Sequence, residues 1–196
     1  MAGKPPAAIT GAMTVDVEDY FQVAAFAGQV QRADWDDFSC RVERNVDRIL
    51  QMFDDHQVSA TFFTLGWVAE RFPHVLRQIA EAGHEVASHG YDHVKVHTQD
   101  PEAFRQDTRK TKRILEDISG QSVKGYRAAS FSIDHRTPWA FDILAEEGHR
   151  YSSSVYPIQH DHYGMPDAPR FAYRPSDGQD LVEVPITTLH LFNRNL

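Results

Sequence analysis

The feature of this sequence that most restricts its fold is an alternation between short β-prone runs and longer segments with helical spacing. The β-prone runs are rich in β-branched and aromatic residues, which favour strands. The expected strands cover residues 13–17, 58–65, 85–88, 123–127, 151–156 and 181–189. Strands that alternate with helices form parallel sheets. We therefore predict an α/β fold with a parallel sheet, either open or closed into a barrel.

The expected helices lie between residues that start and stop helices. One has apolar residues at helical spacing from Val42 to Phe53, and Ser39 is placed to cap it. The later pairs of start and stop signals are Pro73 and Gly83, Asp100-Pro101 and Gly120, and Thr137-Pro138 and Gly148. Each helix follows a predicted strand, as a parallel sheet requires.

The chain length of 196 residues fits one domain. Residues 1–11 are rich in Ala, Pro and Gly and are expected to form a flexible tail, and residues 12–196 form the domain. The loop 157–180 has a length typical of functional segments. Because the sequence stops directly after a strand-like stretch, LHLFNRNL, we expect a domain truncated at its carboxyl-terminal end.

Charge and cysteine content exclude several classes of function. The 20 basic and 28 acidic residues give a net charge of −8, which opposes binding to nucleic acid or to anionic lipid. No segment has the length of a membrane span or of a signal peptide, so we expect no membrane insertion. The single cysteine, Cys40, cannot form an internal disulfide. We therefore expect a cytoplasmic protein.

The first of three polar clusters follows the first predicted strand. Alternation along an extended segment places Asp16 and Glu18 on one side and Val17 on the other. Two carboxylates on one face repel each other unless they share a cation or a proton. An acidic loop that caps a helix, Asp19 included, is the structural alternative.

The second cluster is His89-Gly-Tyr-Asp-His93, which follows the third predicted strand. The H-x3-H spacing places both imidazoles on one face of a helical turn, where they can bind one metal ion. Two histidines and one carboxylate complete a facial triad with open positions. With 11 histidines in the chain, a cluster of solvated or core histidines is an equal alternative, and His84, in a turn, is interpreted as structural.

The third cluster surrounds Arg127, in the segment GYRAASFS after the fourth predicted strand. An arginine beside small residues can hold a carboxylate through two parallel hydrogen bonds, although a surface ion pair fits the segment equally well. The three clusters together supply an open metal site, a base and a positive charge beside that base. These are the parts that metal-assisted hydrolysis needs.

Four stretches of the chain carry a family resemblance: TVDVEDYFQV, ATFFTLGWVAER, AGHEVASHGYDH and GYRAASFSI. With these motifs the sequence resembles the polysaccharide deacetylases, the NodB-homology group of carbohydrate esterase family 4. It is most similar to the deacetylases of exosortase and exopolysaccharide systems. The resemblance extends over essentially the whole chain and implies a distorted (β/α) barrel.

The resemblance implies a role for each cluster. Asp16 becomes the catalytic base and Arg127 the residue that holds it, while His89 and His93 become metal ligands. Glu18 is the first choice for the carboxylate ligand, with Asp19 as the alternate. The expected cofactor is a divalent metal, zinc by ligand type. Tyr91 and His160 are the expected substrate-binding residues.

The sequence departs from the family pattern at two positions and lacks an evident general acid. Ala129 stands where relatives have proline and Ser152 where they have aspartate, and both changes are expected to loosen the support of Arg127. The general acid is expected beyond residue 196. His162 is a further candidate for substrate contact, and His190 is not assigned a role.

The implied activity is metal-dependent hydrolysis of N-acetyl groups on an amino-sugar polysaccharide or oligosaccharide. Two alternatives differ from it in kind. An allantoinase-like amidohydrolase would act on a cyclic amide with a similar motif set. A catalytically inactive polysaccharide-binding module would need neither base nor clamp, and the presence of Asp16 and Arg127 argues against it.

Overall fold

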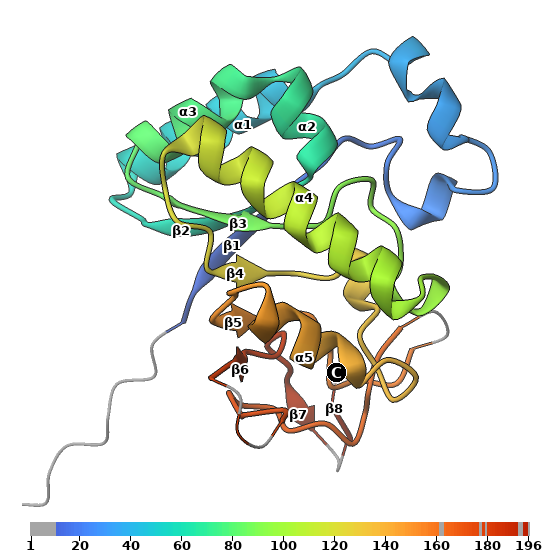
Figure 1. Ribbon diagram of the computed structural model, residues 1–196. Helices are drawn as coiled ribbons and strands as arrows, with labels where there is room; N and C mark the ends of the chain where they lie inside the picture. The colour runs from blue at the N-terminus through green and yellow to red at the C-terminus, as the bar shows by residue number, and fades with distance from the viewer. Residues whose placement is uncertain (1–10, 161–162, 177, 179, 192–193, 196) are drawn as a thin grey trace, which may run out of the picture.

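One six-stranded parallel sheet organises the computed structural model, which describes residues 11–160, 163–176, 178, 180–191 and 194–195 (Figure 1). Residues 1–10 of the expected tail, and His162, lie outside the described residues. The strands, in chain order and also in order across the sheet, are β1 (Met13–Val17), β2 (Ala60–Thr64), β3 (Glu85–Ser88), β4 (Gly125–Tyr126), β5 (Tyr151–Ser152) and β6 (Val182–Glu183). A short antiparallel pair, β7 (His190–Leu191) and β8 (Arg194–Asn195), follows. The predicted α/β fold with a parallel sheet is confirmed.

Strands that lie in chain order are the arrangement of a (β/α) barrel wall, because every right-handed crossover puts its helix on the same side. The helices are α1 (Val42–Asp55), α2 (Gly66–Arg71), α3 (Pro73–Glu81), α4 (Pro101–Ser119) and α5 (Trp139–Glu146). Figure 1 shows α1 to α4 together on one side of the first strands. Four 3-10 turns connect the elements: η1 (Ala24–Phe26), η2 (Arg32–Asp37), η3 (Val96–Thr98) and η4 (Ala129–Phe131). Among the described residues, no helix has the length and apolar character to cross a membrane.

The helix boundaries of α4 show how the local sequence sets these elements. The Asp100 side chain accepts a hydrogen bond from the Ala103 amide at 2.8 Å, and Pro101 opens the first turn. Gly120 ends the helix with φ +69°, a left-handed conformation that glycine adopts at little cost. The predicted start and stop of this helix are therefore confirmed.

The start of α1 is set differently from the sequence prediction. Ser39 does not cap this helix. The carboxylate of Asp19 reaches it from the segment after β1, and its Oδ2 accepts the amides of Arg41 at 2.5 Å and Val42 at 3.0 Å. Because Asp19 lies far from α1 in the sequence, nothing beside the start of this helix marks it as the cap. The prediction that Ser39 caps α1 is wrong.

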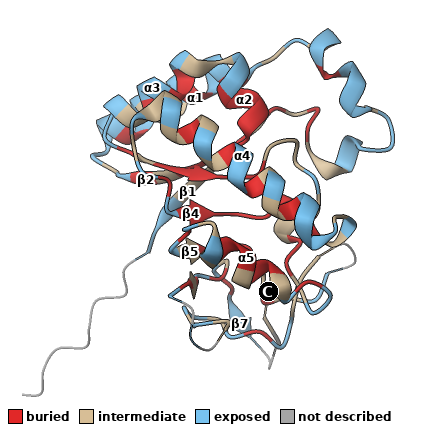
Figure 2. Cartoon of the chain, in the orientation of Figure 1, coloured by how far each residue is buried: buried red, intermediate tan, exposed pale blue. Residues whose placement is uncertain are grey.

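The core has two parts. Under α1 to α3, buried side chains include Phe62, Leu76 and Ile79, and around α4 and α5 they include Phe104 and Leu144 (Figure 2). Burying one such side chain contributes about 1.5–3 kcal/mol. The predicted amphipathic stripes of the helices account for most of these contacts.

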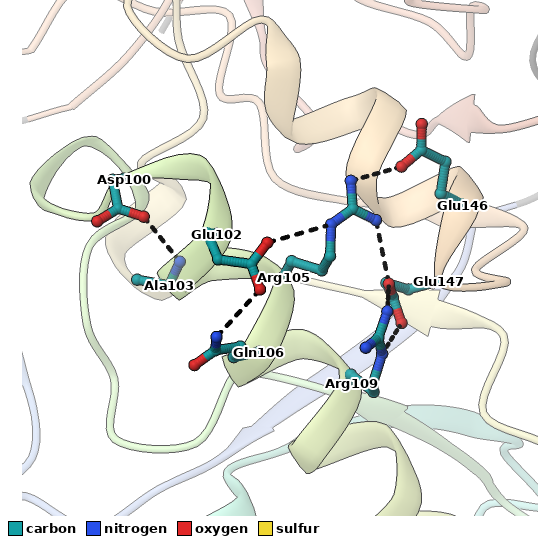
Figure 3. A network of polar contacts seen from close by, with 8 residues as sticks. All are labelled: Asp100, Glu102, Ala103, Arg105, Gln106, Arg109, Glu146 and Glu147. Carbon is teal, nitrogen blue, oxygen red and sulfur yellow. Dashed lines mark hydrogen bonds and ion pairs between the residues drawn. The ribbon is translucent and has the colours of Figure 1, made fainter.

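A polar network joins α4 to the end of α5 (Figure 3). Arg109 binds the Glu147 carboxylate in a two-point contact, from Nε at 2.8 Å and Nη2 at 2.7 Å. Arg105 contacts the same carboxylate at 3.1 Å and that of Glu146 at 2.5 Å. These contacts hold α5 in its place along α4.

The later strands are shorter than predicted. β4, β5 and β6 each have two residues, whereas longer strands were expected at 123–127, 151–156 and 181–189. Beyond β5, the amides of Ser154 and Val155 bind the buried Glu183 side chain instead of a neighbouring strand. Val123 and Val155 are buried as expected, but their amides bind the side chains of Glu116 and Glu183 and not a neighbouring strand.

Candidate active site

The candidate site lies at the carboxyl ends of the strands, where parallel α/β folds place their functional groups. Glu18 follows β1, His89 follows β3 and Arg127 follows β4. The three predicted polar clusters therefore meet at one edge of the sheet.

Glu18, His89 and His93 form a cluster that can hold a metal ion. One ligand atom from each residue lies within 4.8 Å of the other two. His93 Nε2 lies 3.1 Å from Glu18 Oε2, and the two imidazole rings meet edge to face with centroids 5.2 Å apart. Two imidazoles and one carboxylate are a ligand set that divalent transition metals bind.

The protonation of this cluster suits a cation. His89 Nδ1 lies 2.8 Å from the Arg127 carbonyl oxygen, so Nδ1 carries the donating proton and the lone pair of Nε2 is left for a ligand. Burial, and then the charge of His89, lower the pKa of His93 to about 3, which keeps its imidazole neutral. Burial raises the pKa of Glu18, and among the described residues its Oε2 is buried without a hydrogen bond. A bound cation would relieve that cost.

The loop that carries both histidines is not the helical turn that the H-x3-H spacing predicted. β3 ends at Ser88, Gly90 turns the chain with φ +74°, and His93 itself has φ +55°. The Tyr91 amide donates to both carboxylate oxygens of Asp107 on α4, at 3.2 and 3.3 Å. Because an anchor on another element shapes this loop, the spacing brought out the correct pair of residues for an incorrect reason.

Asp16 and Arg127 form the second part of the site. Arg127 Nη1 donates to Asp16 Oδ1 at 2.7 Å, in a pair whose side chains are 5% exposed for Arg127 and 27% for Asp16. The Ser153 carbonyl accepts Nε and the Ser153 hydroxyl accepts Nη2, both at 3.0 Å. Thr14 Oγ1 accepts Nη1 at 3.1 Å. The guanidinium is thus fixed on three sides, and Asp16 presents a carboxylate at the edge of the site.

Ser152, one of the two departures from the family pattern, takes part in hydrogen bonds beside Arg127. The Ser152 hydroxyl donates to Ser154 Oγ at 2.8 Å, and Ser154 Oγ accepts the Ala128 amide at 2.9 Å. Serine hydroxyls thus join the segment after β5 to the segment after β4. Weaker support of Arg127 through the changes at Ala129 and Ser152 stays a prediction.

Asp19 and Tyr91 lie outside the cluster. Asp19 uses both oxygens on backbone amides, Oδ1 on Tyr20 and Oδ2 at the start of α1, so it faces the helix and not the histidines. The Tyr91 hydroxyl donates to Glu70, and the Lys110 ammonium lies 3.1 Å from the centre of the Tyr91 ring. These partners on α2 and α4 place Tyr91 in a contact with both helices, and its role toward substrate stays a prediction.

The other histidines named from the sequence lie apart from the cluster. The His160 ring stacks on Tyr163 at 4.1 Å with an interplanar angle of 8°. His190 lies in β7 and contacts the Asn195 side chain at 2.8 Å. His84 Nδ1 accepts the Ala60 amide at 3.3 Å, a structural contact as the sequence interpretation has it.

Three residues of the Arg127 environment were missed from the sequence: Thr14, Ser153 and Glu183. Thr14 and Ser153 are small polar residues in strand-like runs, with no spacing that marks them. Glu183 is a single acid inside the apolar run LVEVP, and its side chain is fully buried. An acid at an inward position of a predicted strand was the one available signal.

Comparison with known proteins relates most of the chain to one family. A family model described as polysaccharide deacetylase matches residues 33–151. A second model, described as a domain of unknown function, DUF3473, matches residues 153–196. The boundary between the two matches falls at Ser152, the last residue of β5.

Individual relatives match over part of their length. A peptidoglycan-N-acetylglucosamine deacetylase from Bacillus cereus is 34% identical over 94 residues, which are 47% of this chain and 34% of the relative. The chain spans about a third of the length of the first curated relatives it matches.

Solved structures share the fold over more of the chain. A Mycobacterium smegmatis protein classed with the polysaccharide deacetylases superposes with a TM-score of 0.67 at 30% identity, covering 90% of this chain and 58% of that one. A solved allantoinase superposes with a TM-score of 0.63 at 20% identity, covering 90% of this chain and 61% of that one. At that identity the likeness to the allantoinase is one of fold alone.

Proposed function

This chain belongs to the polysaccharide deacetylase family, and we propose that it hydrolyses N-acetyl groups of an amino-sugar polymer at the site between β1, β3 and β4. One observation carries the proposal. A metal-type cluster and a clamped carboxylate lie at the same strand ends, since Asp16 lies near the end of β1, Glu18 directly follows that strand, and His89 binds the backbone of Arg127. Metal-assisted hydrolysis of an amide uses both parts.

Glu18, His89 and His93 would hold the divalent metal, and their chemistry suits zinc. When bound, such an ion lowers the pKa of a water molecule and polarises a carbonyl oxygen. The Nδ1 contact of His89 with the Arg127 carbonyl orients the imidazole toward the cluster. Asp19 has no part in this set, because the start of α1 uses its carboxylate.

Asp16 is the proposed general base. Its carboxylate takes the proton of the attacking water, while Arg127 holds one oxygen at 2.7 Å and leaves the other for that proton. The amide C–N bond then breaks, acetate leaves, and the amine of the sugar takes up a proton. We assign no described residue to the donation of that proton.

The proposed substrate class is an N-acetylated polysaccharide or oligosaccharide, and the proposed subgroup is that of exopolysaccharide deacetylases. The Bacillus cereus relative is named for peptidoglycan N-acetylglucosamine, which has the N-acetylated sugar that this chemistry needs. His160, stacked on Tyr163 in the loop after β5, remains the proposed contact to the sugar.

We further infer that residues 12–196 act as one domain. β5 and β6 pair in parallel across the boundary between the two family models, with Tyr151 opposite Val182 and Ser152 opposite Glu183. A unit that supplies a strand to the same sheet shares its core and its site.

Metal analysis paired with an acetate assay tests the proposal. The purified chain should bind about one zinc ion and release acetate from N-acetylated oligosaccharides. Asp16→Asn should retain the metal and lose about 10²–10⁴-fold in kcat, because the amide cannot accept the proton. Loss of metal together with activity would make Asp16 a ligand instead.

The same assay separates the alternatives. Release of product from a cyclic amide, with no acetate, would favour an allantoinase-like amidohydrolase. Polysaccharide binding with no turnover of either substrate would favour an inactive binding module.

A further inference from the structure

Glu183, the second residue of β6, has a fully buried side chain: the residue is 0% exposed. Its Oε1 accepts the amides of Ser154 and Val155, both at 2.9 Å. A buried carboxylate costs free energy unless hydrogen bonds repay its lost hydration. The two hydrogen bonds from Ser154 and Val155 therefore offset part of the cost of burying Glu183.

Glu183 replaces a missing strand contact. β5 ends at Ser152. The Ser153 amide still donates to the Tyr126 carbonyl at 2.9 Å, but the next two amides, those of Ser154 and Val155, donate to no neighbouring strand, and a buried amide without a partner is costly. One carboxylate oxygen satisfies both of them. The path of residues 153–155 at the carboxyl end of β5 is therefore set by a side chain from β6.

Two of these residues support Arg127, Ser153 directly and Ser154 through the neighbouring Ala128. The Ser153 carbonyl and hydroxyl accept two of the guanidinium nitrogens at 3.0 Å, and Ser154 Oγ accepts the amide of Ala128 at 2.9 Å. A continuous series of hydrogen bonds thus runs from Glu183 through residues 153–155 to Arg127 and on to Asp16.

We propose that Glu183 is a positioning residue, which fixes residues 153–155 and through them the Arg127 guanidinium that orients Asp16. This inference rests on the proposed function for its effect on turnover, but the link from Glu183 to Arg127 stands on geometry alone. In this proposal the segment matched by DUF3473 supplies Glu183 and residues 153–155, which hold Arg127 in place. The earlier part of the sheet supplies Arg127 and Asp16.

Three variants test the proposal. Glu183→Ala removes the acceptor, and Glu183→Gln retains an oxygen at the same position. Glu85→Ala is the matched control, because Glu85 on β3 is also a hydrogen-bonded acid between strands. Its carboxylate accepts the hydroxyls of Thr61 at 2.6 Å and Tyr151 at 2.8 Å, with no contact to Arg127.

The first readout needs no activity. Arg127 Nε–H donates to the Ser153 carbonyl from a side chain that is 5% exposed, so its ¹H–¹⁵N NMR signal should exchange slowly with solvent. Exchange should accelerate at least about 10-fold in Glu183→Ala and stay near the parent rate in Glu183→Gln and Glu85→Ala. An unchanged signal in Glu183→Ala would overturn the proposal.

The second readout is turnover. Displacement of a positioned group by about 1 Å can cost about 10²-fold, so Glu183→Ala should lose about that much in kcat with little change in KM. Glu183→Gln should retain kcat within a few-fold, and a loss of 10-fold or more there would overturn the proposal, even if Glu183→Ala fails to fold. If the parent chain releases no acetate, the proposed function fails, while the NMR readout still decides whether Glu183 fixes Arg127.

Discussion

The two halves of the sheet are built by different means. β1, β2 and β3 pair over five and four residues, and apolar side chains of α1 to α3 cover them. β4, β5 and β6 pair over one or two residues each, and buried serines, Arg127 and Glu183 complete the hydrogen bonding. The first half is thus specified mainly by backbone ladders and apolar burial, the second by particular polar side chains.

This difference separates two tasks within the site. Among the described residues, the three that can hold a metal all belong to the first half. Arg127 belongs to the second half, and Ser153 of that half accepts two of its guanidinium nitrogens, while Thr14 and Asp16 of the first half accept the third. Asp16 stands between them, on a first-half strand but bound to Arg127. A substitution in the metal cluster should therefore leave the position of Arg127 measurable, and a substitution around Arg127 should leave metal binding measurable.

The largest expected effect breaks the metal cluster alone. Glu18→Ala should weaken zinc binding by more than about 10²-fold, beyond the usual cost of losing a group that only supports a ligand. Asp19→Ala should leave zinc binding near the parent value and instead lower the free energy of unfolding by about 1–2 kcal/mol, as loss of a helix cap does.

Isothermal titration with zinc and urea denaturation of the two variants make the comparison. A weaker zinc affinity for Asp19→Ala than for Glu18→Ala would place Asp19 in the cluster.

Truncation of the core compares the stability of the halves. Phe62→Ala in β2 should lower the free energy of unfolding by about 3–5 kcal/mol, because a fully buried aromatic ring leaves a large cavity. Leu181→Ala, beside β6, should cost about 2–3 kcal/mol, at the low end for leucine, because the surrounding irregular segment can close around the cavity. Urea unfolding measures both, and a larger loss for Leu181→Ala would contradict the contrast between the halves.

The buried acid of the second half predicts a pH dependence. Burial raises the pKa of Glu183 to about 7, against hydrogen bonds from the backbone and the charge of Arg127 that lower it. In the unfolded chain this carboxyl has the ordinary glutamate pKa of 4.5, so the folded chain binds more protons between the two pKa values. The free energy of unfolding should therefore fall as the pH rises through this window, by about 3 kcal/mol for this group.

Glu183→Gln should remove this part of the pH dependence and leave the rest. Urea unfolding at a series of pH values measures it for parent and variant. Parallel curves for the two proteins would show that Glu183 does not titrate in this window.

The smallest expected effect is at the surface network of Figure 3. Arg109→Ala removes a two-point contact with Glu147 from a side chain that is 48% exposed, so the free energy of unfolding should fall by about 0.5–1 kcal/mol. The loss should shrink in high salt, because exposed charges are screened. Thermal unfolding at low and high salt measures it, and a loss of 2 kcal/mol or more would show that the network is a main support of α5.

The sequence predicted the first half of the fold better than the second. The residue pattern of β3 predicted its observed bounds, and the pattern around α4 predicted both ends of that helix, because burial and local caps leave a periodic signal. At β5 and β6 the same apolar pattern predicted strands that are too long. The α2 turn, Gly66–Arg71, gave no separate signal because it joins α3 with little interruption.

The site shows the same division between local and distant signals. Alternation placed Glu18 on the side of Asp16, and in the structure Glu18 meets both histidines. The role of Asp19 depends on α1, and the conformation of the histidine loop depends on Asp107, so neither could be read from neighbouring residues. The sequence can indicate the residue types of a site more readily than the anchors that shape it.

The parallel register of the first three strands has a consequence for how the chain folds. Met13 pairs with Ala60, and Thr61 with Glu85, so each pairing must close a long loop before it gains any contact. Glu18 can meet His89 and His93 only after both pairings exist. On the ribosome, β1 therefore emerges before its partner and can pair only once β2 has been synthesised, and Glu18 waits longer, until the histidine loop follows β3. Acquisition of metal affinity would mark the moment at which that wait ends.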